Sequence, residues 1–91
     1  MSGNVIDNPS QGRFELKVGD HLAVAYYTLS PGAITFTHTE VPEALSGQGV
    51  GTRIARGALE QVRTRGLKVI AQCPFIAGFI RKNPEFAALL A

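Results

Sequence analysis

The sequence of 91 residues is poor in cysteine, has no tryptophan and lacks the long apolar run of a membrane segment. Cys73 is the one cysteine, so no disulfide can form within the chain. One cysteine and two histidines are also too few ligands for a cysteine-rich zinc site. No apolar stretch approaches the roughly 20 residues that span a bilayer. Residues 1–7 have no basic segment followed by an apolar one, as a secretory signal would. These absences predict a cytoplasmic protein with no membrane partner and no metal.

Acidic and basic side chains are unevenly divided along the chain. Residues 1–52 hold two basic and five acidic side chains, whereas residues 53–91 hold seven basic and two acidic ones. A basic C-terminal half suits an anionic ligand, although a solvated, arginine-rich helix face gives the same count. Nucleic acid is the least favoured anion, because Phe75 and Phe79 fit a helix core better than a stacking surface.

Strand patterns fill the first half of the chain. Polar and apolar residues alternate, or β-branched and aromatic residues gather, in segments separated by short turns rich in glycine. Three strands are expected, over residues 13–18, 21–29 and 33–41, and their tight turns predict an antiparallel meander. Residues 1–11 before them are typical of a loose lead-in or of a short edge strand.

Helical periodicity follows a glycine-rich turn. Apolar residues recur every four positions from Val50 to Val62 and predict a helix that ends near Gly66. The apolar segment 67–72 predicts a strand parallel to 33–41, in a right-handed β-α-β unit. Further helical segments are expected over 75–82 and 84–90. The predicted fold class is therefore α+β, in a single domain over residues 1–91.

The turn that precedes this helix carries the most chemical information. Gly47, Gly49 and Gly51 allow a sharp turn and a close approach to the peptide nitrogens. Those nitrogens lie at a helix N-terminus, where the dipole and the unpaired N–H groups favour a phosphate. The spacing is neither a Walker motif nor the dinucleotide fingerprint, whose third glycine comes one residue later. A tight turn without a ligand is the competing interpretation of the glycines.

Four short motifs stand in order along the chain. They are His38-Thr39-Glu40-Val41-Pro42, Gly47-Gln48-Gly49-Val50-Gly51, Cys73-Pro74-Phe75 and Arg81-Lys82-Asn83-Pro84-Glu85-Phe86. Together they resemble the minimal, single-domain branch of the GCN5-related N-acetyltransferases (GNAT), over about residues 10 to 90. The resemblance implies a GNAT-like α/β arrangement and a site for acetyl-coenzyme A where two parallel strands separate.

The resemblance also implies which residues hold coenzyme A. Val41 matches the position whose backbone pairs with the pantetheine arm. The turn residues match the cradle for the pyrophosphate, and Arg81 is a further candidate for the cofactor's phosphates. The cradle residues are Gly47, Gln48, Gly49, Val50, Gly51 and Thr52.

His38 and Glu40 are candidates for the group that takes a proton from an amine. They lie two residues apart on one strand, and strict alternation predicts that they face the same side as Ile34 and Phe36. Histidine, which titrates near pH ~6.5, suits this role, and a buried glutamate does too. A structural histidine and a surface carboxylate are the competing interpretation.

Cys73 is expected where a strand ends and a helix begins. A helix N-terminus there favours a thiolate. The thiol is a candidate nucleophile that becomes acetylated, or a proton donor that replaces the tyrosine found in larger relatives where this chain has Arg81. A small buried apolar residue is the third interpretation.

The sequence therefore predicts an N-acetyltransferase that moves an acetyl group from acetyl-coenzyme A to an amine. A small amine, a protein N-terminus and a lysine side chain are all compatible acceptors. The alternative is a coenzyme A-binding module without efficient chemistry, because a chain of 91 residues leaves little material for an acceptor pocket.

Overall fold

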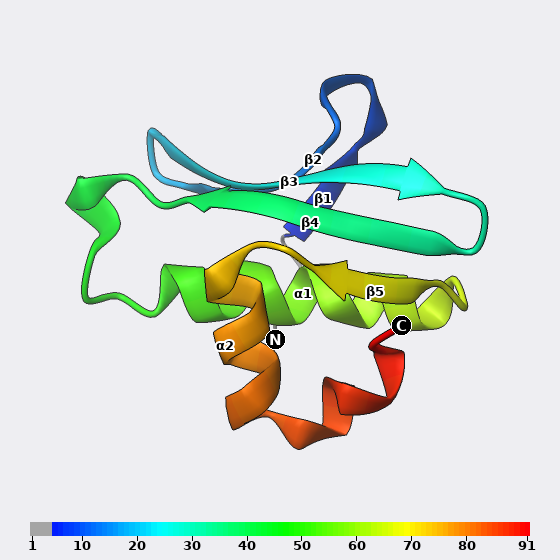
Figure 1. Cartoon of the computed structure of the whole chain (residues 1–91). Coiled ribbons are helices and arrows are strands. Elements are labelled where there is room, and N and C mark those ends of the chain that lie inside the picture. The colour runs from blue at the N-terminus through cyan, green and yellow to red at the C-terminus, as the bar shows by residue number, and fades with distance from the viewer. Residues whose placement is uncertain (1–4) are drawn as a thin grey trace.

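A computed structural model describes residues 5–91, as five strands in one sheet with two α-helices on one face (Figure 1). The first four residues of the predicted lead-in lie outside this range. The strands are β1 (Val5–Asn8), β2 (Arg13–Val18), β3 (His21–Ser30), β4 (Ala33–Glu40) and β5 (Lys68–Ala71), in that order across the sheet. The helices are α1 (Val50–Thr64) and α2 (Pro74–Lys82), with 3-10 helices at Pro9–Gln11, Glu43–Leu45 and Pro84–Leu89.

The strands β2, β3 and β4 form the predicted antiparallel meander, and β1 adds a fourth strand by pairing antiparallel with β2. Between β2 and β3, Val18 pairs with His21 across a two-residue turn in which Gly19 has a φ of +60°. That left-handed conformation is the reason for glycine in this turn. Of the two interpretations of the N-terminal segment, the edge strand is correct from Val5 onward.

The predicted β-α-β unit is confirmed. β4 and β5 run parallel, with Ala33 opposite Lys68 and Phe36 opposite Ala71, and α1 crosses between them. β4 ends one residue earlier than expected, at Glu40, so Val41 follows the strand.

Helix α1 covers the core with one apolar face. Val50, Ile54, Ala58 and Val62 are buried at the expected four-residue spacing, and they pack against β2 and β3 residues such as Phe14. Ile76, Phe79 and Ile80 of α2 enter the same core, as predicted. Among the described residues, no helix is both long and apolar enough to cross a membrane.

The predicted orientation of His38 and Glu40 is wrong. β3 pairs Tyr26 with His38 but Tyr27 with Phe36, so Thr37 of β4 is an extra, bulged residue. A bulge interrupts the alternation of side chains along a strand. His38 and Glu40 therefore share the outer face of the sheet, while Phe36 lies on the helix-covered face.

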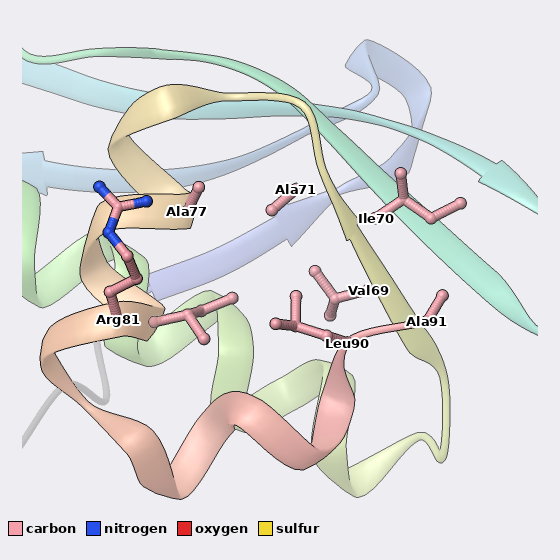
Figure 2. Close-up of a pocket in the computed structure, with 8 residues that line it drawn as sticks. Val69, Ile70, Ala71, Ala77, Arg81, Leu90 and Ala91 are labelled. Carbon is pink, nitrogen blue, oxygen red and sulfur yellow. The ribbon is translucent and has the colours of Figure 1, made fainter.

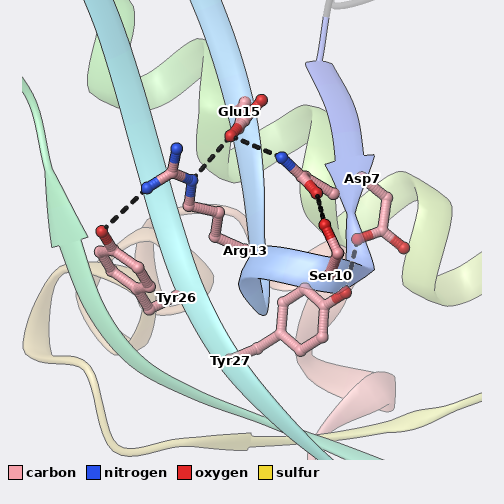
Figure 3. A network of polar contacts seen from close by, with 7 residues as sticks. Asp7, Ser10, Arg13, Glu15, Tyr26 and Tyr27 are labelled. Carbon is pink, nitrogen blue, oxygen red and sulfur yellow. Dashed lines mark hydrogen bonds and ion pairs between the residues drawn. The ribbon is translucent and has the colours of Figure 1, made fainter.

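The outer face of the sheet carries a polar network at its N-terminal edge (Figure 3). Arg13 Nε donates to Glu15 Oε2 at 2.7 Å, and Asn8 Nδ2 donates to the same oxygen at 3.0 Å. These hydrogen bonds, that from Arg13 first, lower the pKa of Glu15. Arg13 Nη1 also donates to the hydroxyl of Tyr26 at 3.1 Å, so three strands are joined on this face.

Candidate functional site

The site begins where β4 and β5 separate. Within the described residues, the last backbone hydrogen bond between them runs from the N–H of Cys73 to the carbonyl of Phe36, at 2.9 Å. The chain then turns into α2 at Pro74, while β4 continues to Glu40. Residues 37–40 consequently have an edge that β5 does not cover, because the register of the two strands stops at Phe36.

Cys73 and Thr39 meet in this gap. Their Sγ and Oγ1 atoms are 3.3 Å apart, and Cys73 is only 3% exposed. The bulge at Thr37 explains why Thr39 reaches the sulfur, because it turns Thr39 toward the helix-covered side, opposite Ala25. Cys73 also occupies the N-cap position of α2, and its carbonyl accepts the N–H of Ala77 at 3.0 Å. The predicted location at the start of a helix is thus correct.

The N-terminus of α1 has the properties of a phosphate cradle. No side chain caps it, and its N-cap, Gly49, has a φ of +72°. The N–H groups of Val50, Gly51 and Thr52 belong to the first turn, where a helix offers them no acceptor. The N–H of Gln48 is already used, because it donates to the carbonyl of Leu45 at 3.3 Å. Three consecutive uncapped amides at a helix N-terminus can hold a phosphate group.

A groove of about 290 Å³ opens beside this cradle, between α1 and α2. The ring of Phe75 lies against Gly51, where an added Cβ would come within 2.7 Å of the phenylalanine Cζ. The ring therefore covers Gly51 on the groove side, where a side chain would displace it, whereas the Cβ positions of Gly47 and Gly49 face open space. The groove is lined by Thr52, Pro74, Phe75, Gly78, Phe79, Arg81 and Lys82.

His38 and Glu40 lie on the opposite side of the sheet from the cradle. His38 Nε2 and Glu40 Oε2 are 3.1 Å apart, and both side chains are more than half exposed, at 61% and 59%. The imidazole stacks on the ring of Tyr26, with centroids 6.4 Å apart and planes inclined by 11°. The pair is thus open to solvent and held by a neighbouring aromatic ring.

A second groove, of about 360 Å³, follows the outer edge of β5 (Figure 2). The C-terminal residues close part of that edge, because the N–H of Ala91 donates to the carbonyl of Val69 at 2.9 Å. Figure 2 shows Arg81 at the α2 end of this groove, next to Ala77. Arg81 lines both grooves, and the lining of the second is otherwise apolar.

The predicted residues thus separate into two groups. The turn residues and Arg81 surround the α1–α2 side, whereas His38 and Glu40 occupy the outer face, with Cys73 in the gap between them. Thr39 and Phe75 were missed as contributors to the site. The sequence held one usable signal for Phe75, the glycine at position 51 against which its ring packs, but none for Thr39, because the bulge that directs Thr39 depends on pairing with β3.

Over residues 5–91, no three acidic, histidine or cysteine side chains gather as a metal site would require.

Comparison with known proteins bears directly on this arrangement. The family model for the GCN5-related N-acetyl-transferases matches residues 13–89. The chain belongs to the GCN5-related N-acetyltransferase family. Members of the family generally bind acetyl-coenzyme A, and acetyl transfer is the activity that gives the family its name.

Relatives and a solved structure agree with this assignment. Protein NATD1 of Bos taurus is 31% identical over 65 residues, which are 71% of this chain and 58% of that protein. Protein NATD1 of Danio rerio is 31% identical over 66 residues, 72% of this chain and 60% of that protein. The aligned region is therefore less than two thirds of the length of these relatives. The solution structure of a GCN5-like protein from Staphylococcus aureus has a TM-score of 0.73 at 26% identity, covering 100% of this chain and 91% of that one. The GNAT-like α/β fold is thereby confirmed.

Proposed function

We propose that this protein transfers the acetyl group of acetyl-coenzyme A to an amine. One observation carries the proposal: the gap between β4 and β5 has an uncapped phosphate cradle on one side of the sheet and the His38–Glu40 pair on the other. A donor and an acceptor can thus reach the same gap from opposite faces without competing for space.

The cradle and the open strand edge would hold the cofactor. The N–H groups of Val50, Gly51 and Thr52 are placed to donate to its pyrophosphate, and Gly47 and Gly49 give the turn its left-handed residues. The backbone of residues 37–40 and Val41 offers donors and acceptors to the amides of the pantetheine arm. Acetyl-coenzyme A would supply a thioester carbonyl for attack.

His38 and Glu40 are proposed to accept the proton of the attacking amine. Their side chains are exposed on the face where an acceptor arrives, and they lie within hydrogen-bond distance of each other. A proton taken by the imidazole leaves it beside the carboxylate, which stabilises the resulting cation.

Cys73 is proposed to act at the thioester, in one of two ways. Its thiol donates a proton to the departing thiolate of coenzyme A, or its sulfur attacks the carbonyl. In the second case a bond forms from Sγ to the acetyl carbon, the thioester bond breaks and the thiol proton passes to coenzyme A. Thr39, within 3.3 Å of the sulfur, would position Cys73 in both cases.

Binding is tested by thermal unfolding with acetyl-coenzyme A. The cofactor is expected to raise the melting temperature of the wild type, by the stabilisation that any ligand specific to the folded state provides. Gly49→Asp is expected to abolish the rise, because it places a carboxylate among the amides. Gly32→Asp is the matched control, since Gly32 has a φ of +74° and lies at the far end of β4. An unchanged wild-type melting curve at millimolar cofactor contradicts the proposal.

Chemistry is tested by acetyl transfer to a library of amines. His38→Ala and Glu40→Gln are expected to slow turnover about 10²-fold or more, with binding of acetyl-coenzyme A preserved. His21→Ala is the control, because His21 is an exposed histidine at the start of β3. Binding without turnover of any amine by the wild type would favour the alternative function, a coenzyme A-binding module.

The two roles of Cys73 are separated by mass spectrometry. Incubation with acetyl-coenzyme A and no amine adds one acetyl group to Cys73 if the sulfur is the nucleophile, and none if it is the proton donor. Cys73→Ala is expected to reduce turnover in both cases. Turnover at the wild-type rate in Cys73→Ala would show that the residue has neither role.

A further inference from the structure

The groove along the outer edge of β5 has no part in the proposed reaction, because β5 itself lies between this groove and the gap to β4. We propose that this β5 groove, of about 360 Å³, binds an extended peptide of a partner protein, which adds to the sheet as a strand beside β5. The peptide carries an apolar side chain that enters the groove and, two residues away, a carboxylate that meets Arg81. This docking site goes beyond the proposed function and does not depend on it.

The backbone of β5 has an edge on the side away from β4. β5 is the last strand in the order of the sheet, and the N–H of Lys68 donates toward β4, to the carbonyl of Gly32 at 3.0 Å. Because the backbone groups of successive residues in a strand point to opposite sides, those of Val69 and Ala71 point to the outer edge. The carbonyl of Val69 already accepts the N–H of Ala91 at 2.9 Å, so this edge takes an extended chain as a partner. Ala71 lies beyond that bond, in the lining of the groove, where a further chain can pair with it.

The hollow of the β5 groove suits an apolar side chain. Figure 2 shows Val69 and Ala71 on the β5 side of the groove and Ala77 on the α2 side. Ile70 and Leu90 also line it, and these large apolar side chains are 39% and 42% exposed. An apolar side chain of the peptide would remove part of this surface from water.

Arg81 gives the β5 groove one charge. Figure 2 shows its guanidinium group at the α2 end, and no acidic side chain lines the groove. Within residues 5–91 it forms no ion pair, whereas Arg13, Arg56 and Arg65 each pair with a carboxylate. A cation in the last turn of a helix is favoured by the helix dipole, but that effect does not require it to line a groove. An unpaired guanidinium beside an apolar hollow and a strand edge matches a peptide that carries a carboxylate.

The test is an NMR titration of the ¹⁵N-labelled full chain, without coenzyme A, with the end-blocked peptide Glu-Thr-Leu-Thr-Glu. Side chains two apart on a strand face the same side, so one glutamate reaches Arg81 whichever way the peptide runs. Shifts of the amide signals of Ala71, Ala77 and Leu90 are expected, with a dissociation constant on the order of 1 mM. The peptide Gln-Thr-Leu-Thr-Gln is expected to bind about fivefold more weakly, and this difference is expected to fall as salt is added.

Strand pairing is tested with the glutamate peptide methylated at its central amide nitrogens. Methylation is expected to abolish binding, because it removes the N–H donors that a strand needs. Retained affinity would overturn the inference, since the peptide would then bind through its side chains alone.

Variants of the chain test the charge and the hollow. Arg81→Gln is expected to bind the two peptides equally, and Arg81→Lys to keep a preference for glutamate. Lys82→Gln is the control, because Lys82 is the next exposed cation of α2 and does not line the β5 groove. Ala77→Leu is expected to abolish binding by filling the hollow, and Ala87→Leu, at an exposed alanine, is its control. A dispersed amide spectrum shows that each variant is folded.

Four results with the wild type overturn the inference. They are no shift along β5 at about ten times the expected dissociation constant, and equal affinity for the glutamate and glutamine peptides. Shifts of the same amides that depend on protein concentration alone would assign the groove to a second copy of the chain. Binding of octanoate there, without binding of the peptide, would assign it to a small carboxylate. Because coenzyme A is absent throughout, these outcomes leave the proposed function untouched.

Discussion

Gly51 is the position where the absence of a side chain matters most for the site. The ring of Phe75 occupies the space that a Cβ would need, 2.7 Å from its Cζ. Alanine usually favours a helix over glycine by about 1 kcal/mol, so the contact with the ring opposes the intrinsic preference. Packing between the two helices thus explains why position 51 is glycine. A left-handed turn does not explain it, because the φ angle of Gly51 is not positive.

A double-mutant cycle tests this contact. Gly51→Ala is expected to destabilise the wild type by about 1 kcal/mol, because the ring must shift. In the Phe75→Ala background the same change is expected to be neutral or stabilising, since only the helix propensity is left. Free energies of unfolding from urea titration give the coupling. Equal effects of Gly51→Ala in the two backgrounds would contradict the contact.

Tyr27 is a buried phenol with a pH-dependent contribution to stability. Its hydroxyl donates to Asp7 Oδ1 at 2.5 Å, and burial first, then this hydrogen bond, raises its pKa to about 12. The folded state thus favours the neutral form. The stabilisation is complete below the usual value of 10.0 and is lost as pH rises toward 12.

Tyr27→Phe is expected to cost about 1 kcal/mol near neutral pH, where the hydrogen bond is intact. The difference from the wild type is expected to shrink above pH 10.0, because only the wild type must ionise a buried phenol. Unfolding by urea at a series of alkaline pH values measures it. The Tyr26→Phe variant, on the outer face, serves as the comparison. A difference that stays constant with pH would contradict the assignment.

At the scale of secondary-structure elements, Arg56 of α1 forms hydrogen bonds to the C-terminal segment. Its guanidinium donates to Asn83 Oδ1 at 3.0 Å and to Glu85 Oε2 at 3.3 Å. It also lies 5.5 Å from the ring centre of Phe79 and 5.7 Å from that of Phe86. One side chain thus connects α1 with the end of α2 and the following 3-10 helix.

Arg56→Ala is expected to lower the free energy of unfolding by about 1–2 kcal/mol, through the lost hydrogen bonds and cation–π contacts. Arg56→Lys is expected to recover little, because an ammonium cannot donate to both partners in the same planar arrangement. Arg53→Ala, on the same helix, is the control. Equal stability of the wild type and Arg56→Ala would show that the contacts contribute nothing.

The bulge in β4 is the local feature that decides the faces of the site. It lets Thr39 reach Cys73 on the inner side while His38 stacks on Tyr26 outside. Alternation in the sequence predicted the strand well, but it predicted the wrong face for His38. A bulge depends on how two strands pair, and one strand's own pattern does not contain that information.

Across the molecule, two carboxylates far apart in the sequence contribute to the dependence of stability on pH in acid. Hydrogen bonds from Arg13 and Asn8 lower the pKa of Glu15, and that of Glu85 is lowered by a backbone hydrogen bond and by Arg56. Both groups ionise more readily in the folded state. Their stabilisation is present above the usual value of 4.5 and is lost as pH falls through the lowered folded values.

The wild type is therefore expected to lose stability as pH falls below 4.5, and the Glu15→Gln, Glu85→Gln double variant to lose less. Near neutral pH the double variant is expected to be the less stable protein, and the gap is expected to narrow in acid. Melting temperatures across this range measure the effect, with Glu43→Gln as an exposed control. Parallel pH profiles would contradict it.

The sequence alone determined the order of strands and helices, the parallel β-α-β unit and the glycine turn at the start of α1. These features depend on local periodicity and on backbone preferences of neighbouring residues, which a short window contains. Four motifs were also enough to indicate the family.

Only the tertiary structure decided how the functional residues share the site. The separation of β4 and β5, the contact of Thr39 with Cys73 and the groove between α1 and α2 all join residues distant in the chain. They depend on strand register and on side-chain packing between elements, and those are set when the sheet and the helices assemble around one core.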